Sequence, residues 1–186
     1  QFDRPLEEAI LEPLRDLTRR RAKREPLQHL LGTVEFMGRE FKCDARALIP
    51  RPETEELIEK ILAHYKKENL PPPARILDMG TGSGVIGLSL AHAFPDSHAT
   101  LADVSPEALA LAGENAGKTA LPAGRASFVL TDLFQNLTGG PFDLIVANLP
   151  YIAAEEVPTL SAEVQRDPVL ALDGGPVGTE IIARFL

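Results

Sequence analysis

Hydrophobic positions in the first part of the chain follow two different periods. Four of them recur every three or four residues, and this spacing predicts a helix over residues 5–25. Apolar and polar residues then alternate over residues 33–49, which predicts a β-hairpin with its turn near Gly38. A second helix is expected from residue 53, because acidic side chains occupy its first turn, where the helix dipole favours negative charge. The apolar positions of the first helix are Leu6, Ile10, Leu14 and Leu17.

From residue 74 onward, short apolar runs alternate with helical patterns. Strands that alternate with helices are typical of a parallel sheet, so the predicted fold class is α/β with a doubly wound, Rossmann-like sheet. Residues 155–175 show no regular period, and a last helix is expected over residues 179–186. The predicted strands cover residues 75–78, 99–103, 127–130 and 142–147, and the intervening helices cover residues 84–93 and begin again at residue 105.

These elements divide the chain into three parts. Residues 1–27 are interpreted as the remnant of an N-terminal helical domain, because their helix has no partner helix in the sequence. Residues 28–52 form a hairpin linker, and residues 53–186 form the α/β domain. Four parallel strands would leave a bare sheet edge, which proteins usually cover. We therefore expect the domain to be incomplete at its C-terminal end and the chain to be a piece of a longer protein.

Charge and composition exclude several classes of protein. The net charge of −8 disfavours nonspecific attraction to phosphates, so a nucleic acid is not expected as the direct substrate. No apolar run reaches the roughly 20 residues that a membrane-spanning helix needs, and no signal peptide is visible. The lone Cys43 cannot form an intramolecular disulfide, and the four histidines are too scattered for a metal site. We expect a cytoplasmic protein without metal or membrane association.

The basic run at residues 19–24 has two interpretations. It fits the end of a solvated helix, because cations are favoured at the negative end of the helix dipole. It also fits a docking patch for an acidic partner or RNA.

A glycine-rich loop follows the first strand of the predicted sheet. Its glycines permit a tight turn in which the backbone can approach a ligand at a helix N-terminus. Residues 82–87 also match G-x-G-x-x-G, so the loop taken alone fits a nicotinamide or flavin enzyme as well. The candidate cofactor contacts in the loop are Gly80, Thr81, Gly82, Ser83 and Gly84.

Acidic residues that follow the first three strands favour S-adenosylmethionine as the cofactor. Asp78 ends the first strand, where it could orient the glycine loop or meet the cationic methionine end of the cofactor. Asp103 ends the second strand, and its carboxylate could accept hydrogen bonds from both ribose hydroxyls. Asp132 and Leu133 follow the third strand and are placed to contact the edge and face of adenine, although Asp132 could instead cap a turn.

The most informative feature is the tetrapeptide that follows the fourth strand, where residues 148–151 read Asn-Leu-Pro-Tyr. The Asn148 carboxamide oxygen and the Leu149 backbone carbonyl can each accept one hydrogen bond from a planar NH2 group. Those bonds would turn the nitrogen lone pair towards an electrophilic methyl group, so Asn148 is also expected near the cofactor. Pro150 would stiffen the loop, and Tyr151 could stack on the planar group. With the glycine loop, this tetrapeptide predicts methyl transfer to an amide or amine nitrogen.

With these motifs the chain resembles the HemK/PrmC family of protein-(glutamine-N5) methyltransferases, which modify the Gly-Gly-Gln loop of peptide-chain release factors. The resemblance covers residues 26–186. It rests on Pro-Leu-Gln-His-Leu-Leu-Gly at residues 26–32, on Pro-Arg-Pro-Glu-Thr-Glu at residues 50–55, and on Ala-Leu-Asp-Gly-Gly at residues 171–175. These signatures are more specific than the glycine loop, which every class of this fold shares.

The resemblance implies a class I S-adenosylmethionine-dependent enzyme that methylates glutamine by direct in-line transfer. Residues 80–84, Asp103 and Leu133 would then contact the cofactor, and residues 148–151 would hold the glutamine side chain. The resemblance also implies an N-terminal helical bundle that helps dock the release factor, as well as closing strands beyond residue 186.

One departure from the family pattern leaves an alternative open. The family usually reads Asn-Pro-Pro-Tyr, and the Asn-Leu-Pro-Tyr found here is similar to the motif of ribosomal RNA adenine dimethyltransferases. The exocyclic amine of adenine resembles a carboxamide, so an adenine-N6 methyltransferase acting on RNA or DNA is the alternative. The acidic net charge and residues 50–55 favour a protein substrate. A third interpretation is a truncated, inactive domain that serves as a binding module.

Overall fold

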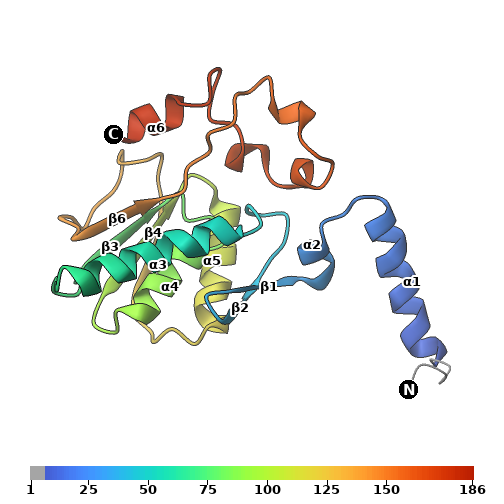
Figure 1. Cartoon of the computed structure of the whole chain (residues 1–186), viewed down its shortest axis with the longest axis horizontal. Coiled ribbons are helices and arrows are strands. Elements are labelled where there is room, and N and C mark those ends of the chain that lie inside the picture. The colour runs from blue at the N-terminus through green and yellow to red at the C-terminus, as the bar shows by residue number, and fades with distance from the viewer. Residues whose placement is uncertain (1–6) are drawn as a thin grey trace.

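A parallel sheet of four strands forms the centre of the structure, a computed structural model that describes residues 7–186 (Figure 1). The order across the sheet is β5-β4-β3-β6, and each neighbouring pair is parallel. Because β4 and β6 lie on opposite sides of β3, the loops that follow β3 and β6 diverge, and such a divergence is where ligands bind in open α/β sheets. The strands are β3 (Arg75–Met79), β4 (His98–Asp103), β5 (Ala126–Leu130) and β6 (Leu144–Ala147).

Helices cover both faces of the sheet, which confirms the predicted doubly wound α/β class. Ile76 and Leu101 point to one face, where they pack in a core with α3, α4, α5 and the hairpin. Leu77 and Met79 point to the other face, where they pack in a second core with α6. No helix among the described residues is long and apolar enough to cross a membrane. The helices are α1 (Glu8–Ala22), α2 (Leu27–Leu31), α3 (Pro52–Lys67), α4 (Val85–Ala93), α5 (Pro106–Lys118) and α6 (Glu180–Phe185).

The N-terminal segment forms the helix that the sequence predicted over residues 5–25, here α1, and a second short helix, α2, beyond that range. α1 ends in a turn at Arg24, whose φ of 65° is left-handed. The amides of Arg24 and of the next residue bond back to carbonyls in the last turn of α1, a pattern that ends many helices. Pro26 disfavours helix at the residue before it and caps α2, which the sequence analysis missed. The predicted start of the helix and its apolar position Leu6 lie outside the described residues.

The basic run at residues 19–24 makes ion pairs with other parts of the chain. Arg21 and Arg24 contact the carboxylate of Glu163 at 3.0 and 2.7 Å. These two ion pairs link α1 to the C-terminal part of the chain, although α1 stands well to the side of the sheet (Figure 1).

The hairpin is shorter than the predicted range of 33–49. It consists of β1 (Thr33–Phe36) and β2 (Arg39–Lys42), which pair in antiparallel fashion. Met37 and Gly38 in the turn have φ of 49° and 69°, and two left-handed residues match the twist of a two-residue hairpin turn. Residues 43–49 form a loop, and Ala47 of this loop lies next to the glycine loop at Gly82.

Residues 152–178 leave the sheet and return to the point where they began. Their ends are joined by backbone hydrogen bonds from the Ile152 amide to the Leu172 carbonyl at 3.1 Å and from the Gly174 amide to the Ile152 carbonyl at 2.9 Å. A Cβ atom at Gly174 would lie 2.5 Å from the carbonyl oxygen of Gly178, so only glycine fits there. We call this closed segment the strap. It contains three short 3-10 helices, η1 (Val157–Thr159), η2 (Val164–Arg166) and η3 (Val169–Ala171).

Candidate functional site

The glycine loop connects β3 to α4 at the carboxyl end of the sheet. Gly80, Gly82 and Gly84 have φ of 68°, 56° and 85°, a backbone conformation that favours glycine. Gly84 caps α4 from the left-handed region, and a Cβ atom there would lie 3.0 to 3.2 Å from three side chains. The loop is thereby held tightly against the core, and its exposed side is bare backbone at a helix N-terminus.

Asp78 lies beneath this loop and is fully buried. Its Oδ2 accepts hydrogen bonds from the Thr81 hydroxyl at 2.6 Å and from the Gly87 amide at 2.8 Å. Burial raises the pKa of this carboxyl to about 6. Asp78 does not line the cavity described below, so its position favours the orienting role over a direct cofactor contact.

Asp103 ends β4 beside the glycine loop and lines the cavity. Its Oδ2 accepts a hydrogen bond from the Gly82 amide at 2.8 Å, and its Oδ1 accepts one from the Ser105 amide at 2.9 Å. These bonds fix the carboxylate, and each oxygen keeps lone-pair capacity for a ligand hydroxyl.

The turn after β5 contributes one of its two predicted residues to the cavity. Leu133 lines the cavity, with a left-handed φ of 50°. Asp132 points elsewhere and pairs with Arg184 of α6 at 2.7 Å, so it does not line the cavity. Thr131, which the sequence analysis missed, does line it, and the Thr131 hydroxyl donates to the Leu133 carbonyl at 2.9 Å.

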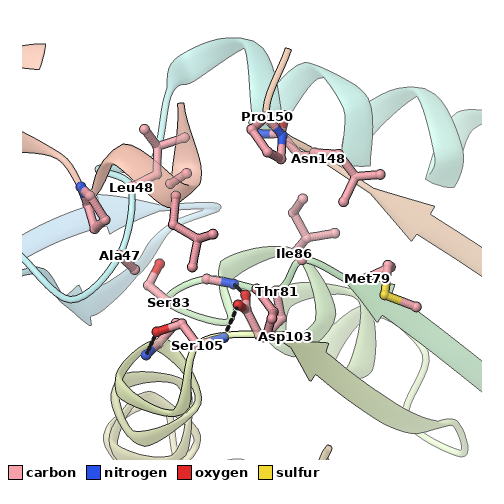
Figure 2. A pocket seen from close by; sticks show the side chains of 18 of the residues that line it. Ala47, Leu48, Met79, Thr81, Ser83, Ile86, Asp103, Ser105, Asn148 and Pro150 are labelled. Carbon is pink, nitrogen blue, oxygen red and sulfur yellow. Dashed lines mark hydrogen bonds between the residues drawn. The ribbon is translucent and has the colours of Figure 1, made fainter. Parts of the chain in front are cut away.

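The 148–151 tetrapeptide follows β6 on the opposite side of the cavity. Figure 2 shows Asn148 and Pro150 across from Ser83, Thr81 and Asp103. Leu149 is buried, and its side chain packs against Gly80, where a Cβ atom would lie 3.0 Å from Leu149 Cδ2.

Two neighbouring cavities meet at this tetrapeptide. The first cavity is bounded by the glycine loop, Asp103 and Leu133, and the second is lined by Tyr151, which is 67% exposed. Asn148 and Leu149 line both cavities, whereas Tyr151 lines only the second. Of the predicted site residues, the structure therefore brings together the loop from Gly80 to Ser83, Asp103, Leu133 and the tetrapeptide. Asp78, Gly84 and Asp132 lie outside both linings.

Sequence reasoning missed a large part of the cavity walls. Two of the missed groups come from residues 50–55 and 171–175, which the sequence showed only as family signatures. Those signatures were the signal that could have located these parts of the cavity wall. The other missed residues come from the loop after the hairpin, from the beginning of α4 and α5, from the strap and from α6. The missed lining residues of the first cavity include Arg46, Ala47, Leu48, Pro50, Arg51, Thr54, Val85, Ile86, Ser105, Pro168, Leu170, Ala171, Asp173 and Ile181.

The strap is held against the site by an ion pair between a half-exposed arginine and a buried aspartate. Arg51 contacts the carboxylate of Asp167 at 2.6 Å, and Asp167 also accepts a hydrogen bond from the Ile49 amide at 3.2 Å. Burial raises the pKa of Asp167, while the Ile49 amide and Arg51 act in the opposite direction. This contact positions the η3 end of the strap over the first cavity.

The two cavities do not present unpaired positive charge. Their lining includes Arg46 and Arg51, and each of these arginines is paired with a carboxylate of the chain. The lining also includes the acids Asp103, Asp173 and Glu53. These described residues therefore give the cavities no excess of positive charge.

Comparisons with known proteins agree with this geometry. The family model described as "Methyltransferase small domain" matches residues 57–166, and the one described as "PrmC N-terminal domain" matches residues 1–32. A "Release factor glutamine methyltransferase" of Deinococcus radiodurans is 45% identical over 166 residues, which are 89% of this chain and 57% of that protein. A "Ribosomal protein uL3 glutamine methyltransferase" of Francisella tularensis is 37% identical, covering 88% of this chain and 51% of that protein. The chain thus spans little more than half the length of these relatives.

A solved structure shows the same fold. The catalytic domain of hMettl16, in complex with a MAT2A 3′UTR hairpin, has a TM-score of 0.59, and the likeness covers 81% of this chain and 56% of that chain. At 17% identity this likeness concerns the fold alone. The matches confirm the class I methyltransferase fold and the resemblance to release factor glutamine methyltransferases. Because the first family model spans more than half of the sequence, the chain belongs to the methyltransferase small domain family.

Proposed function

We propose that this chain carries the catalytic site of an S-adenosylmethionine-dependent enzyme that methylates the glutamine of the Gly-Gly-Gln loop in a peptide-chain release factor. The observation that carries the proposal is the position of Asn148 at the junction of the two cavities, because the donor and the acceptor of a methyl group must meet there. The names of relatives at 45% and 37% identity support glutamine as the acceptor. Release factors act on ribosomes, so the proposal also assigns the enzyme to the cytoplasm.

The first cavity fits S-adenosylmethionine. When bound, this cofactor supplies an electrophilic methyl group attached to a sulfonium. The fixed carboxylate of Asp103 can accept hydrogen bonds from ribose hydroxyls, and the apolar side chain of Leu133 can cover one face of adenine. At Gly80 and Gly82 the glycine loop lets backbone come close to the ligand, and Thr81 and Ser83 of the same loop also line the cavity. We propose that these residues bind the cofactor.

The second cavity fits the side chain of glutamine. Among the described residues, neither the Asn148 carboxamide oxygen nor the Leu149 carbonyl oxygen accepts a hydrogen bond. Both are thus available to the two N–H groups of a substrate carboxamide, and exposed Tyr151 can close over its plane. A neutral amide nitrogen is a weak nucleophile, so the site acts chiefly by positioning and electrostatics, and the proton leaves after transfer.

The charges around the cavities favour a protein substrate over a nucleic acid. Proteins that bind nucleic acid supply Lys and Arg to neutralise phosphates. Here the two arginines of the lining are occupied by carboxylates of the chain, as described above. The adenine-N6 alternative has no such support from the lining.

The test is incubation of the protein with methyl-labelled S-adenosylmethionine and a release factor. The control is the same release factor with the Gly-Gly-Gln glutamine replaced by alanine. Label that enters only the unchanged factor supports the proposal. Label in a ribosomal protein, or in added RNA or DNA, with none in the release factor, would overturn it.

A further inference from the structure

The segment at residues 50–55, which carries one of the family signatures, connects three separate parts of the structure. Arg51 pairs with Asp167 of the strap, as described above. The Glu55 carboxylate accepts a hydrogen bond from the Met37 amide in the hairpin turn. Between them, the Thr54 hydroxyl contacts the side chain of Asn148, with a distance of 3.4 Å from Asn148 Nδ2 to Thr54 Oγ1. The first turn of α3 is thus held in place on both sides of the contact with the tetrapeptide.

Thr54 is placed to act on the site without being an exposed part of it. Its side chain is buried, with 8% of the residue exposed, yet it lines both the first and the second cavity. Asn148 is exposed at the cavity mouth. A buried side chain therefore contacts an exposed one.

The direction of this hydrogen bond matters for the proposed reaction. The Asn148 carboxamide has an oxygen at one corner and an NH2 group at the other. When the NH2 group donates to Thr54, the oxygen is left to face the substrate. If the carboxamide were turned over, its NH2 group would face the NH2 group of the glutamine, and two donors cannot bond to one another. A hydroxyl can accept the Asn148 N–H, whereas an aliphatic side chain of the same shape cannot.

We infer that Thr54 is a positioning residue, which holds the Asn148 carboxamide with its oxygen directed at the acceptor nitrogen of the substrate. The inference rests on the proposed function and assigns a role to a residue outside the tetrapeptide. It also explains why the signature at residues 50–55 belongs to the active site in space, although it lies 94 residues away in sequence.

The test compares Thr54→Val, which keeps the shape and loses the hydroxyl, with Thr54→Ser, which keeps the hydroxyl. In the longest natural chain that contains this sequence, we expect Thr54→Val to lower kcat for release-factor methylation by about three- to tenfold, the contribution of one neutral hydrogen bond. The Kd for S-adenosylmethionine should change by less than about twofold, because Asn148 acts on the acceptor. Thr54→Ser should recover most of kcat. Thr119→Val is the matched control, because the Thr119 hydroxyl bonds a helix carbonyl and lines neither cavity.

A second measurement keeps the inference testable apart from the activity. Nuclear magnetic resonance of the Asn148 side-chain NH2 group, assigned with Asn148→Ala, should show one ordered pair of signals in the wild type and in Thr54→Ser. In Thr54→Val the two signals should move to the chemical shifts of a free asparagine side chain. If Thr54→Val does not fold, Thr54→Ala is measured instead. A wild type that labels no release factor contradicts the proposed function alone. Equal kcat in Thr54→Val and wild type, or unchanged Asn148 signals, overturns the role of Thr54.

Discussion

Gly84 offers a quantitative test of how the glycine loop is held, because two different costs of replacing it can be separated. Its φ of 85° is left-handed, and a side chain in that region costs about 1–2 kcal/mol. In addition, a Cβ atom at this position would lie 3.0 to 3.2 Å from side-chain atoms of Leu88, Ala112 and Leu101. Such overpacking of a core costs about 1–3 kcal/mol more. We therefore expect Gly84→Ala to lower the free energy of unfolding by about 2–5 kcal/mol.

Two other glycines provide matched controls for this substitution. Gly124 has nearly the same φ, 80°, with no atom within 4 Å of an added Cβ, so Gly124→Ala should cost only the backbone term of about 1–2 kcal/mol. Gly117 lies inside α5 with open space around it, and Gly117→Ala should stabilise the protein by about 0.5–1 kcal/mol. Urea unfolding at constant m-value measures all three. A loss for Gly84→Ala no larger than for Gly124→Ala would refute the tight packing of the loop.

Three further predictions concern the site. Asn148→Ala should lower kcat about 100-fold with little change in the Kd of S-adenosylmethionine, as misplaced reacting groups do; a near-normal rate in the labelling assay would remove its central role. Asp103→Ala should weaken cofactor binding about 10- to 100-fold by titration calorimetry, the contribution of hydrogen bonds to a charged group, and an unchanged Kd would move the ribose contact elsewhere. Burial raises the pKa of Asp78 to about 6 from its ordinary 3.8, so between these values the folded state holds a proton that the unfolded state has lost. The free energy of unfolding should therefore fall as pH rises from about 4 to about 6, and Asp78→Asn should remove about 3 kcal/mol of that fall. Denaturant unfolding of both proteins at a series of pH values measures this difference. The same dependence on pH in the wild type and in Asp78→Asn would contradict the prediction.

The sheet could be predicted from the sequence because buried parallel strands are short apolar runs, and each is followed here by a marked turn. The positions of glycines and acids at the strand ends also follow from the sequence. The direction of a side chain does not. Asp78 could have faced the ligand from the end of β3, but its carboxylate turns to the Gly87 amide of α4 beneath the loop. Asp132 pairs with Arg184, 52 residues away, and no local pattern indicates that contact.

The strap and the cavity walls could not be predicted for a related reason. Residues 155–175 have no period because their conformation depends on distant partners, such as Arg51 for Asp167 and Ile152 for Gly174. The sequence shows the order of the segments along the chain but not which loops meet at the end of the sheet. Asn148 was therefore predicted to hold the substrate from the tetrapeptide alone, whereas Thr54 was recognised only as part of a motif, and the contact between them was not predicted. The roles of both residues in catalysis stay predictions.

The closed ends of the strap have a consequence for how such a protein can change. The two ends are joined by backbone hydrogen bonds and by a glycine that tolerates no side chain, so they depend little on the sequence between them. The entropic cost of closing a loop grows only slowly with its length, so insertions between the ends are tolerated well. Insertion, deletion or exchange of residues 155–166 can thus change the shape of the rim of the site while the tetrapeptide stays in place. Recognition of a protein surface and the chemistry beneath it can in this way evolve as separate modules of one polypeptide.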